Sequence, residues 1–412
     1  MVGALAAPWV WHRFDVERCF LGWARATEGL RPWAVYEAGS RGLAAVDCDY
    51  PPVVPYLLTA VERVRLLLPT EEIPGRLAVV LLKGPSLLAW AVAVLLAHHW
   101  TRRSQGEEQA RMAAALVAAC LPVFVNAAVW GQFDGMVALV LMLAVAALLD
   151  GRPRVAGAVL GLGLATKLLL VAAVPVMAVW TYRREGGRRL ASMLAAAVLT
   201  MVLLAIPHAV GGGTHGVTAA YAGAVGYYPR RTMEAYNPWY LLDRLESRMG
   251  GLSPAEVRLD TRPVAGPLTY RHLGLAALGA YLLFICAQVW RRPRPDVLVL
   301  GVSLSLFGFF MLPTQIHGRY LVAAVPVLAL AAARSRLAWV LFVGLGVTAS
   351  LGQLIELARS ILQHSYRLDP SAWPDIRGSR ALVRGAAVST ALANLGLFAW
   401  ATLAFRREAG RN

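Results

Sequence analysis

The sequence predicts an all-α, polytopic membrane protein, and three observations support this class. Hydrophobic residues make up 58% of the 412 positions, and the mean hydropathy is +0.55. Apolar runs of roughly 15–24 residues recur along the chain, and about 20 such residues cross the hydrocarbon core of a bilayer as a helix. Arginines gather in short loops between these runs, as expected of cytoplasmic loops. Membrane topology therefore explains the net charge of +16, and no nucleic-acid partner is predicted.

About eleven segments have the composition of spanning or half-spanning helices. We expect them at residues 77–100, 112–129, 133–149, 155–165, 168–182, 190–210, 269–290, 297–312, 319–333, 337–357 and 384–405. The pair 155–165 and 168–182 is short, so it forms either two tilted helices or a re-entrant pair whose apex is Thr166-Lys167. The stretch Met1–Trp11 is apolar, but it is short and lacks the basic start of a signal peptide. One interpretation is that it ends a first spanning helix whose start lies upstream of this sequence.

The arginine clusters assign the two sides of the membrane, because basic loops are retained in the cytoplasm. Six clusters fall on one side of the predicted segments: Arg102, Arg103 and Arg111; Arg152 and Arg154; Arg183, Arg184, Arg188 and Arg189; Arg291, Arg292 and Arg294; Arg334 and Arg336; Arg406, Arg407 and Arg411. The outer side then carries loops 12–76, 211–268 and 358–380, the turns Trp130–Gly135 and Pro313–Gly318, and the Thr166-Lys167 apex. We expect one integral membrane domain over residues 1–405 and a cytoplasmic tail at 406–412.

The first outer loop, residues 12–76, contains two predicted amphipathic helices that lie in the membrane interface. Apolar residues recur at helical spacing from Phe14 to Leu30, with charged residues between them, and again over Val54–Leu68. Tyr50-Pro51-Pro52 marks a rigid turn between the two helices. Cys19 and Cys48 both fall in this loop, so a disulfide between them is left open.

The outer side also gathers the residue types that a sugar-transfer site needs. Carboxylates suit a general base, and lysine or arginine near the membrane boundary suits a phosphate. The set comprises Asp15, Asp47, Asp49, Asp134, Lys83, Lys167, Arg230, Arg231, His317 and Arg319. Each member also has a structural interpretation: Asp15 as a helix cap, Arg230 and Arg231 as surface charges, and the neighbouring Trp130 as an interface anchor. The shared side of the membrane is what favours a site.

Several short motifs resemble, in their order, those of bacterial glycosyltransferases of the GT-C superfamily, including the family 87 mannosyltransferases. The motifs are Asp15, Cys48-Asp49-Tyr50-Pro51-Pro52-Val53-Val54-Pro55-Tyr56-Leu57-Leu58, Trp130-Gly131-Gln132-Phe133-Asp134, Ala165-Thr166-Lys167, Ala235-Tyr236-Asn237-Pro238-Trp239 and His317-Gly318-Arg319-Tyr320. The resemblance implies a GT-C fold and an enzyme that takes a sugar from a polyprenyl-phosphate carrier.

The resemblance also implies roles for individual residues. Asp15 matches the catalytic base, and Lys167, His317 and Arg319 match positions near the donor phosphate. Gln132 and Asp134 match the outer turn that shapes the sugar site. Asp49, Tyr50 and Asn237 lie in matching stretches and join the sugar or acceptor site. In the implied single displacement, Asp15 takes a proton from an acceptor hydroxyl, whose oxygen attacks the anomeric carbon while the polyprenyl phosphate leaves.

The partners implied are a polyprenyl-phosphate-linked sugar, mannose first among the candidates, a lipid or glycan acceptor, and the plasma membrane, with the active site facing outward. The chain shows no glycine-rich nucleotide motif, and no cofactor is assigned. A divalent cation, Mg²⁺ or Mn²⁺, between Asp15 and other acids is left open. A transporter or flippase of lipid-linked sugars and a non-catalytic membrane scaffold are the alternatives.

Overall fold

The structure of the chain is a computed structural model that describes residues 11–68, 74–250, 253–368 and 373–410. These residues form two compact units, each described here by itself. Unit one consists of the described residues of Met1–Ala119, Val123–Val171 and Thr181–Val225. Unit two consists of those of Cys120–Pro122, Ala172–Trp180 and Gly226–Asn412. Most of the apolar stretch Met1–Trp11 lies outside the described residues.

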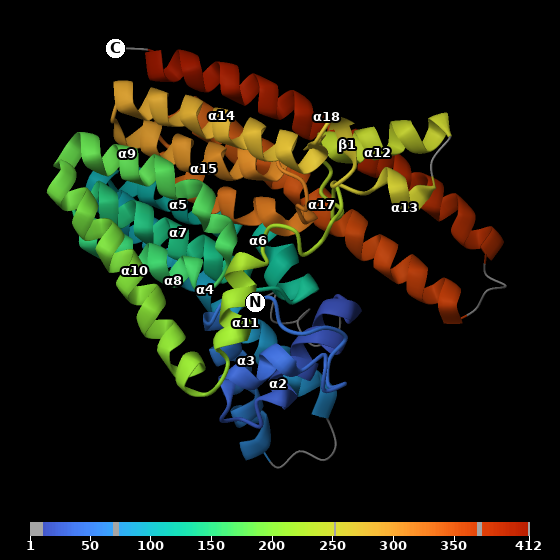
Figure 1. The fold of residues 1–412 in the computed structure, drawn as a ribbon. Helices are drawn as coiled ribbons and strands as arrows, with labels where there is room; N and C mark the ends of the chain where they lie inside the picture. Colours follow the sequence, from blue (N-terminus) through green and yellow to red (C-terminus); the bar gives the residue numbers. More distant parts are fainter. Residues whose placement is uncertain (1–10, 69–73, 251–252, 369–372, 411–412) are drawn as a thin grey trace. The chain divides into compact units, whose positions relative to one another are not determined.

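Unit one is built from helices. Its elements are η1 (Phe14–Phe20), α2 (Leu21–Ala26), η2 (Pro32–Glu37), α3 (Val53–Leu67), α4 (Pro74–Gln105), α5 (Glu107–Ala118), η3 (Val125–Trp130), α7 (Asp134–Leu149), α8 (Pro153–Leu164), α10 (Gly187–Val210) and α11 (Thr214–Ala222). Helix α4 packs against α5 and α7, and α8 packs between α7 and α10 (Figure 1). The approach of α8 to α10 depends on Gly157 and Gly161, where a Cβ atom would lie 2.0 and 2.3 Å from the carbonyl oxygens of Met193 and Ala197. Such closely spaced small residues let membrane helices pack backbone to backbone.

The segment predicted to be the first outer loop contains two helical stretches, as the sequence indicates. The η1–α2 helical stretch and α3 pack together over a core that includes Val16, Phe20 and Leu58. Apolar side chains at the edges remain exposed, among them Phe14 at 47% and Leu67 at 75%. Exposed apolar residues of this kind are consistent with helices lying in the membrane interface. Cys19 and Cys48 are both buried free thiols, so the structure contains no disulfide between them.

Unit two is also helical, apart from one short hairpin. It contains α12 (Pro238–Met249), α13 (Pro254–Val257), β1 (Pro263–Ala265), β2 (Leu268–Thr269), α14 (Tyr270–Arg291), α15 (Pro295–Met311), η5 (Gly318–Ala324), η6 (Pro326–Leu328), α16 (Ala329–Ala332), α17 (Arg336–Leu368) and α18 (Trp373–Gly410). The strands β1 and β2 pair antiparallel. Helix α15 packs against α14 and α18, and α18 also packs against α17 and α12. Three further elements fall at the junctions of the two units along the chain: α6 (Leu121–Phe124), η4 (Leu168–Ala173) and α9 (Val174–Glu185).

The predicted all-α membrane class is confirmed. Within the described residues, six helices are long and apolar enough to span a bilayer, and four shorter helical stretches are apolar. Ten of the eleven predicted segments correspond to these ten stretches; the eleventh, 168–182, is divided between η4 and α9. The predicted outer loops contain more helix than expected. Loop 211–268 includes α11, α12 and α13, and the two sides of loop 358–380 continue α17 to Leu368 and begin α18 at Trp373.

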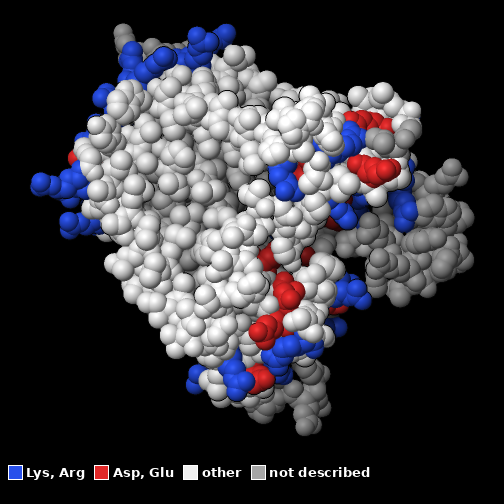
Figure 2. All heavy atoms as spheres, in the orientation of Figure 1, with Lys and Arg blue, Asp and Glu red and all other residues white. Residues whose placement is uncertain are grey.

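Contacts inside each unit place the arginine clusters at common helix ends. In unit one, the Trp100 Nε1 atom donates to Asp150 Oδ1 at 3.0 Å, so α4 and α7 end at the same level. In unit two, Arg294 Nη2 donates to the Glu408 carbonyl at 3.4 Å, which brings the start of α15 to the end of α18. In unit one, Figure 2 shows a broad surface over α10 without Lys, Arg, Asp or Glu, with basic side chains near the start of that helix. This distribution agrees with a lipid-facing surface bounded by polar ends.

Candidate active site

Asp15 occupies the first turn of the π-helix η1. The side chain is 15% exposed, so it is largely withdrawn from solvent yet accessible. The free N–H groups of a helix N-terminus favour a negative charge at this position. Short π-helical segments recur at functional sites, and a second one, η3, ends at Trp130 and faces the same carboxylate.

Two side chains of the Trp130–Gln132 turn donate hydrogen bonds to the Asp15 carboxylate. The indole Nε1 of Trp130 donates to Asp15 Oδ2 at 2.9 Å, and the side-chain amide of Gln132 donates to the same oxygen. His12 stacks on Trp130 with ring centroids 4.8 Å apart, and its Nδ1 lies 3.5 Å from Asp15 Oδ1. Trp130 is therefore a buried partner of Asp15, not the interface anchor that its sequence context also allowed.

Gly131 makes the turn possible. Its φ angle is +91°, in the left-handed region that glycine adopts without strain. A Cβ atom there would lie 2.9 Å from Val16 Cγ2 and 3.3 Å from Lys83 Cε. The glycine thus lets η1 approach the turn closely enough for the contacts with Asp15 to form.

Asp134 and Lys167 form a buried ion pair, with side-chain exposures of 1% and 8%. Asn126 completes the carboxylate's surroundings: its Nδ2 donates to Asp134 Oδ2 at 3.0 Å, and its Oδ1 accepts from the Asp134 backbone N–H at 3.2 Å. The positive charge of Lys167 is therefore already balanced. The sequence assigned these two residues to different parts of the site, whereas the structure joins them.

Tyr50 connects the Asp15 cluster with the Asp134–Lys167 pair. Its hydroxyl donates to Gln132 Oε1 at 3.1 Å, and the Lys167 Nζ atom lies 6.0 Å from the centre of its ring. The Val53 N–H donates to the Ala165 carbonyl at 2.9 Å, which ties the segment after Tyr50 to the turn before Lys167. The result is one continuous set of polar contacts, here called the unit-one network: His12, Asp15, Tyr50, Asn126, Trp130, Gln132, Asp134 and Lys167.

Two other candidates lie beside this network in unit one. Asp49 is half-buried next to Tyr50. The pKa of the Cys48 thiol is raised, first because the thiol is buried and then because the negative charge of Asp49 lies near it. Lys83 is fully buried and its Nζ donates to the Ala128 carbonyl at 2.7 Å. Lys83 thus points into the protein.

His317 and Arg319 belong to unit two. His317 precedes η5 and contacts the rings of Tyr228 and Tyr320, with centroids 5.2 and 5.3 Å away. Arg319 is half-buried in the first turn of η5. At the intervening Gly318, a Cβ atom would approach the Glu234 carbonyl oxygen to 2.6 Å, so this segment packs directly on the backbone of the preceding loop.

Asn237 is fully buried and works as a helix cap. Its Oδ1 accepts from the Tyr240 N–H at 3.3 Å at the start of α12, and its Nδ2 donates to the Phe310 carbonyl at 3.0 Å. Both ends of the amide are used in holding α12 to α15. This geometry favours a structural role over contact with a sugar.

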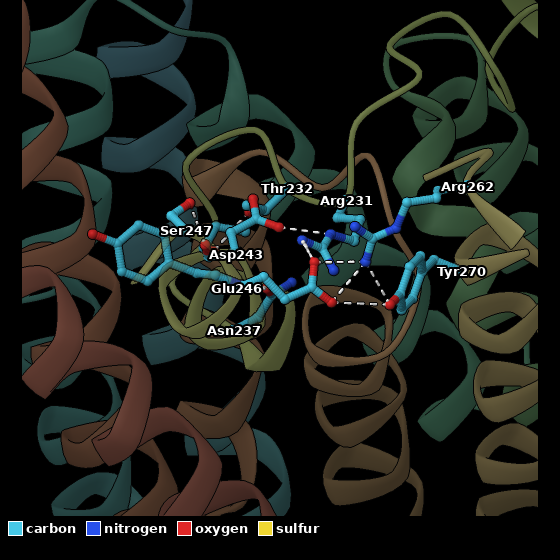
Figure 3. A network of polar contacts seen from close by, with 10 residues as sticks. Arg231, Thr232, Asn237, Asp243, Glu246, Ser247, Arg262 and Tyr270 are labelled. Carbon is cyan, nitrogen blue, oxygen red and sulfur yellow. Dashed lines mark hydrogen bonds and ion pairs between the residues drawn. The ribbon is translucent and has the colours of Figure 1, made fainter. Parts of the chain in front are cut away.

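A polar network centred on Arg231 holds together residues between Arg231 and Tyr270 in unit two (Figure 3). The Arg231 side chain is 0% exposed and pairs with Asp243 at 2.6 Å and Glu246 at 3.0 Å. Arg262 also pairs with Glu246 and donates to the Tyr270 hydroxyl at 2.8 Å. Burial raises the pKa of Asp243 to about 6, against the opposing attraction of Arg231 and Arg258. The interpretation of Arg231 as a surface charge is therefore wrong.

A second buried carboxylate joins the same segment to the turn before His317. Asp260 is 0% exposed and receives two hydrogen bonds of 3.0 Å from Arg271. It also accepts from Thr314 at 2.9 Å and Gln315 at 2.6 Å. The acceptor in each of these contacts is the Asp260 carboxylate, and hydrogen bonds to a carboxylate are stronger than those between neutral groups. They give His317 and Arg319 a rigid support.

Two members of the unit-one network were not identified from the sequence. Asn126 is an amide inside an apolar run, and polar residues at such positions are commonly functional. His12 lies three residues before Asp15, which is the spacing that brings side chains together on a helix. Among the residues that the structure describes, no cluster of three or more His, Cys, Asp or Glu side chains could hold a metal ion. The geometry adds no support for a divalent cation.

Comparisons with known proteins agree with this architecture. The family model described as glycosyltransferase family 87 matches residues 50–313, which is 264 of the 412 residues. Two crystal structures of ArnT from Cupriavidus metallidurans are similar in fold, one in the apo state and one bound to undecaprenyl phosphate. Their TM-scores are 0.52 and 0.53; in both, 17% of residues are identical and the match covers 98% of this chain and 74% of ArnT. No curated protein sequence matches the chain.

Proposed function

The chain belongs to glycosyltransferase family 87, and from this premise we propose that it transfers a sugar from a polyprenyl-phosphate carrier to a lipid or glycan acceptor. Mannose is the first candidate sugar, and the outer face of the plasma membrane is the proposed side. The GT-C-like fold shared with ArnT, which has been crystallised with undecaprenyl phosphate, supports a lipid-linked donor. The single observation that carries the proposal is the unit-one network, which connects Asp15 with the Lys167–Asp134 pair.

Asp15 is the proposed general base. It removes a proton from the acceptor hydroxyl, the hydroxyl oxygen bonds to the anomeric carbon, and the bond from that carbon to the phosphate oxygen breaks. Two hydrogen bonds to Oδ2 hold the carboxylate in place, and Oδ1 is directed toward His12. A base held in this way is already oriented, so little conformational entropy is lost when it reacts.

The departing phosphate needs hydrogen-bond donors and positive charge. Lys167, His317 and Arg319 are the residues proposed to supply them. Because Asp134 balances the charge of Lys167, we assign Lys167 the role of a hydrogen-bond donor to the departing phosphate. Asp49, Tyr50, Gln132 and Asp134 are the proposed sugar and acceptor contacts.

Sugar transfer tests the proposal. Membranes containing the chain would receive radiolabelled polyprenyl-phosphate mannose, with the glucose and arabinose analogues in parallel. We expect transfer by the wild type and a loss of about 10²–10⁴-fold in Asp15→Asn, the usual contribution of a general base. Asp47→Asn is the matched control, because Asp47 lies in the same segment but only accepts from the N–H groups of Gly39 and Ser40.

Three outcomes are informative. Equal transfer by wild type and Asp15→Asn would reject Asp15 as the base and direct attention to Asp49 or Asp134. Loss of transfer in both Asp15→Asn and Asp47→Asn would indicate a damaged outer segment. Absence of transfer from any of the three donors by a folded wild-type chain would contradict the proposed donor class and favour a transporter or a scaffold.

A further inference from the structure

Backbone strain is concentrated beside His317 in unit two. Among the residues that the structure describes, three that are not glycine have φ angles in the left-handed region: Glu28 at +51°, Glu234 at +61° and Gln315 at +67°. This conformation is unfavourable for a residue with a Cβ atom, because the Cβ approaches the following carbonyl oxygen. Glu234 and Gln315 are distant in sequence but close in space: the Met233 N–H donates to the Ile316 carbonyl at 2.9 Å, and Glu234 forms an isolated β-bridge with His317.

Gln315 is held in this conformation by contacts at both ends of its side-chain amide. Its Oε1 accepts from the Gly226 N–H at 2.8 Å, and its Nε2 donates to the buried Asp260 carboxylate at 2.6 Å. Its backbone N–H donates to the Arg230 carbonyl at 3.0 Å. A strained conformation persists where the surrounding contacts outweigh the preference of the backbone, and Gln315 meets this condition.

The side chain of Glu234 reaches α17. Its carboxylate forms an ion pair with Arg359 of that helix, and Glu356, three residues earlier, lies 3.6 Å from the same guanidinium. The side chains of Glu234 and Arg359 are 35% and 30% exposed. Solvent therefore reduces what this pair contributes to the free energy of unfolding, but the pair still fixes the direction of the Glu234 side chain.

The backbone of Glu234 lies directly against the segment that carries His317 and Arg319. At the intervening Gly318, a Cβ atom would lie 2.6 Å from the Glu234 carbonyl oxygen. A glycine at 234 would adopt the left-handed φ without strain, and the partly exposed ion pair adds little stability. Stability alone therefore does not account for a glutamate at this position. Residues in strained conformations cluster at functional sites, where the strain is part of the mechanism.

We propose that Glu234 is a positioning residue for binding of the donor phosphate. Its ion pair with Arg359 holds the left-handed backbone at Glu234, and this backbone sets the place of His317 and Arg319. The inference rests on the proposed function, which assigns His317 and Arg319 to that phosphate. The charge of Glu234 by itself would repel a phosphate, whereas a correctly placed Arg319 binds it. The two effects of Glu234 on an anionic ligand therefore have opposite signs.

Binding of undecaprenyl phosphate to the purified full chain in neutral detergent tests this role. Glu234→Gln should weaken binding about tenfold, because small displacements of groups that contact a ligand have large effects. Removal of a negative charge without any positioning role would instead make this variant bind more tightly. Glu234→Asp keeps the carboxylate and adopts the left-handed conformation more readily, so its affinity should stay within about threefold of wild type.

Glu28 provides a matched control in unit one. It has a similar φ of +51° and lies 3.6 and 3.8 Å from two exposed arginines. Glu28→Gly and Glu234→Gly remove the same kind of strain and a comparable ion pair, so their midpoints of unfolding in SDS should shift alike. Glu234→Gly should also weaken binding of undecaprenyl phosphate about tenfold, whereas Glu28→Gly should change it less than about twofold. A purely structural role would not separate binding from stability in this way.

Arg319→Gln distinguishes a failure of this inference from a failure of the proposed function. If Arg319→Gln weakens binding but Glu234→Gln and Glu234→Gly do not, the positioning role is overturned and the assignment of Arg319 to the phosphate stands. If Arg319→Gln binds as the wild type does, or the wild type binds no undecaprenyl phosphate, that assignment fails and the inference fails with it. Equal weakening of binding by Glu234→Gly and Glu28→Gly would also overturn the positioning role, because it would indicate a general loss of structure.

Discussion

The buried Asp134–Lys167 pair allows a quantitative test of unit one. Replacing Asp134 with Asn leaves the Lys167 ammonium buried without its counter-charge, and Lys167→Met does the same to the carboxylate. With side-chain exposures of only 1% and 8%, water cannot replace the missing partner. Each single change should therefore reduce the free energy of unfolding by about 3–5 kcal/mol.

The double variant Asp134→Asn/Lys167→Met should recover most of this loss. An asparagine at 134 can still accept from Asn126, and methionine fills much of the volume of the lysine chain. Replacement of a whole buried pair by neutral groups is often close to neutral. The double variant should lie within about 2 kcal/mol of wild type, which implies a coupling energy of several kcal/mol between the two positions.

Unfolding in mixed micelles with increasing SDS, followed by far-ultraviolet circular dichroism, measures these free energies without any substrate. The exposed pair Arg111–Glu107 is the control: its atoms are 3.1 Å apart, but its side chains are 76% and 49% exposed. The same cycle there should show little coupling, because solvent screens exposed pairs. Additive losses at Asp134 and Lys167, with no recovery in the double variant, would refute the buried pair.

The helical framework was largely predictable because hydrocarbon leaves few alternatives. A spanning backbone must satisfy its own hydrogen bonds, so length and hydropathy locate helices well. The predicted segment 297–312 corresponds to α15 at Pro295–Met311, and 190–210 corresponds to α10 at Gly187–Val210. Hydropathy does not identify helices that continue outside the bilayer. For this reason the sequence predicted a loop at 358–380, where the structure has the end of α17 and the start of α18.

Pairing between distant residues was the part that the sequence could not supply. Asp15 and Gln132 are 117 positions apart, and Asp134 and Lys167 are 33 apart. The motifs identified these residues as candidates, but the periodicity of a sequence does not predict which distant side chain pairs with each carboxylate.

Two residues of unit two show what local patterns could have revealed. Asn237-Pro238 is a common start of a helix, with the asparagine as cap and the proline in the first turn, and the structure uses Asn237 in this way. Arg231 could also be interpreted as a surface charge, because its partners were unknown. Asp243 and Glu246 are three residues apart on one face of α12, a spacing that could have indicated a shared cation.

The two remaining predictions concern a glycine and a carboxylate. Gly131→Ala should destabilise the chain by about 1–3 kcal/mol more than Gly212→Ala, because both have φ near +90° but only Gly131 faces Val16 Cγ2 at 2.9 Å; equal losses in SDS unfolding would contradict the close approach. Burial raises the pKa of Asp243 to about 6, so between about pH 4 and 6 the folded chain keeps a proton that the unfolded chain has released. The contribution of Asp243 to the free energy of unfolding should therefore fall as pH rises through this window, by up to about 3 kcal/mol. Asp243→Asn should remove this slope, and a wild-type stability that rises with pH relative to Asp243→Asn would show that attraction to Arg231 outweighs burial.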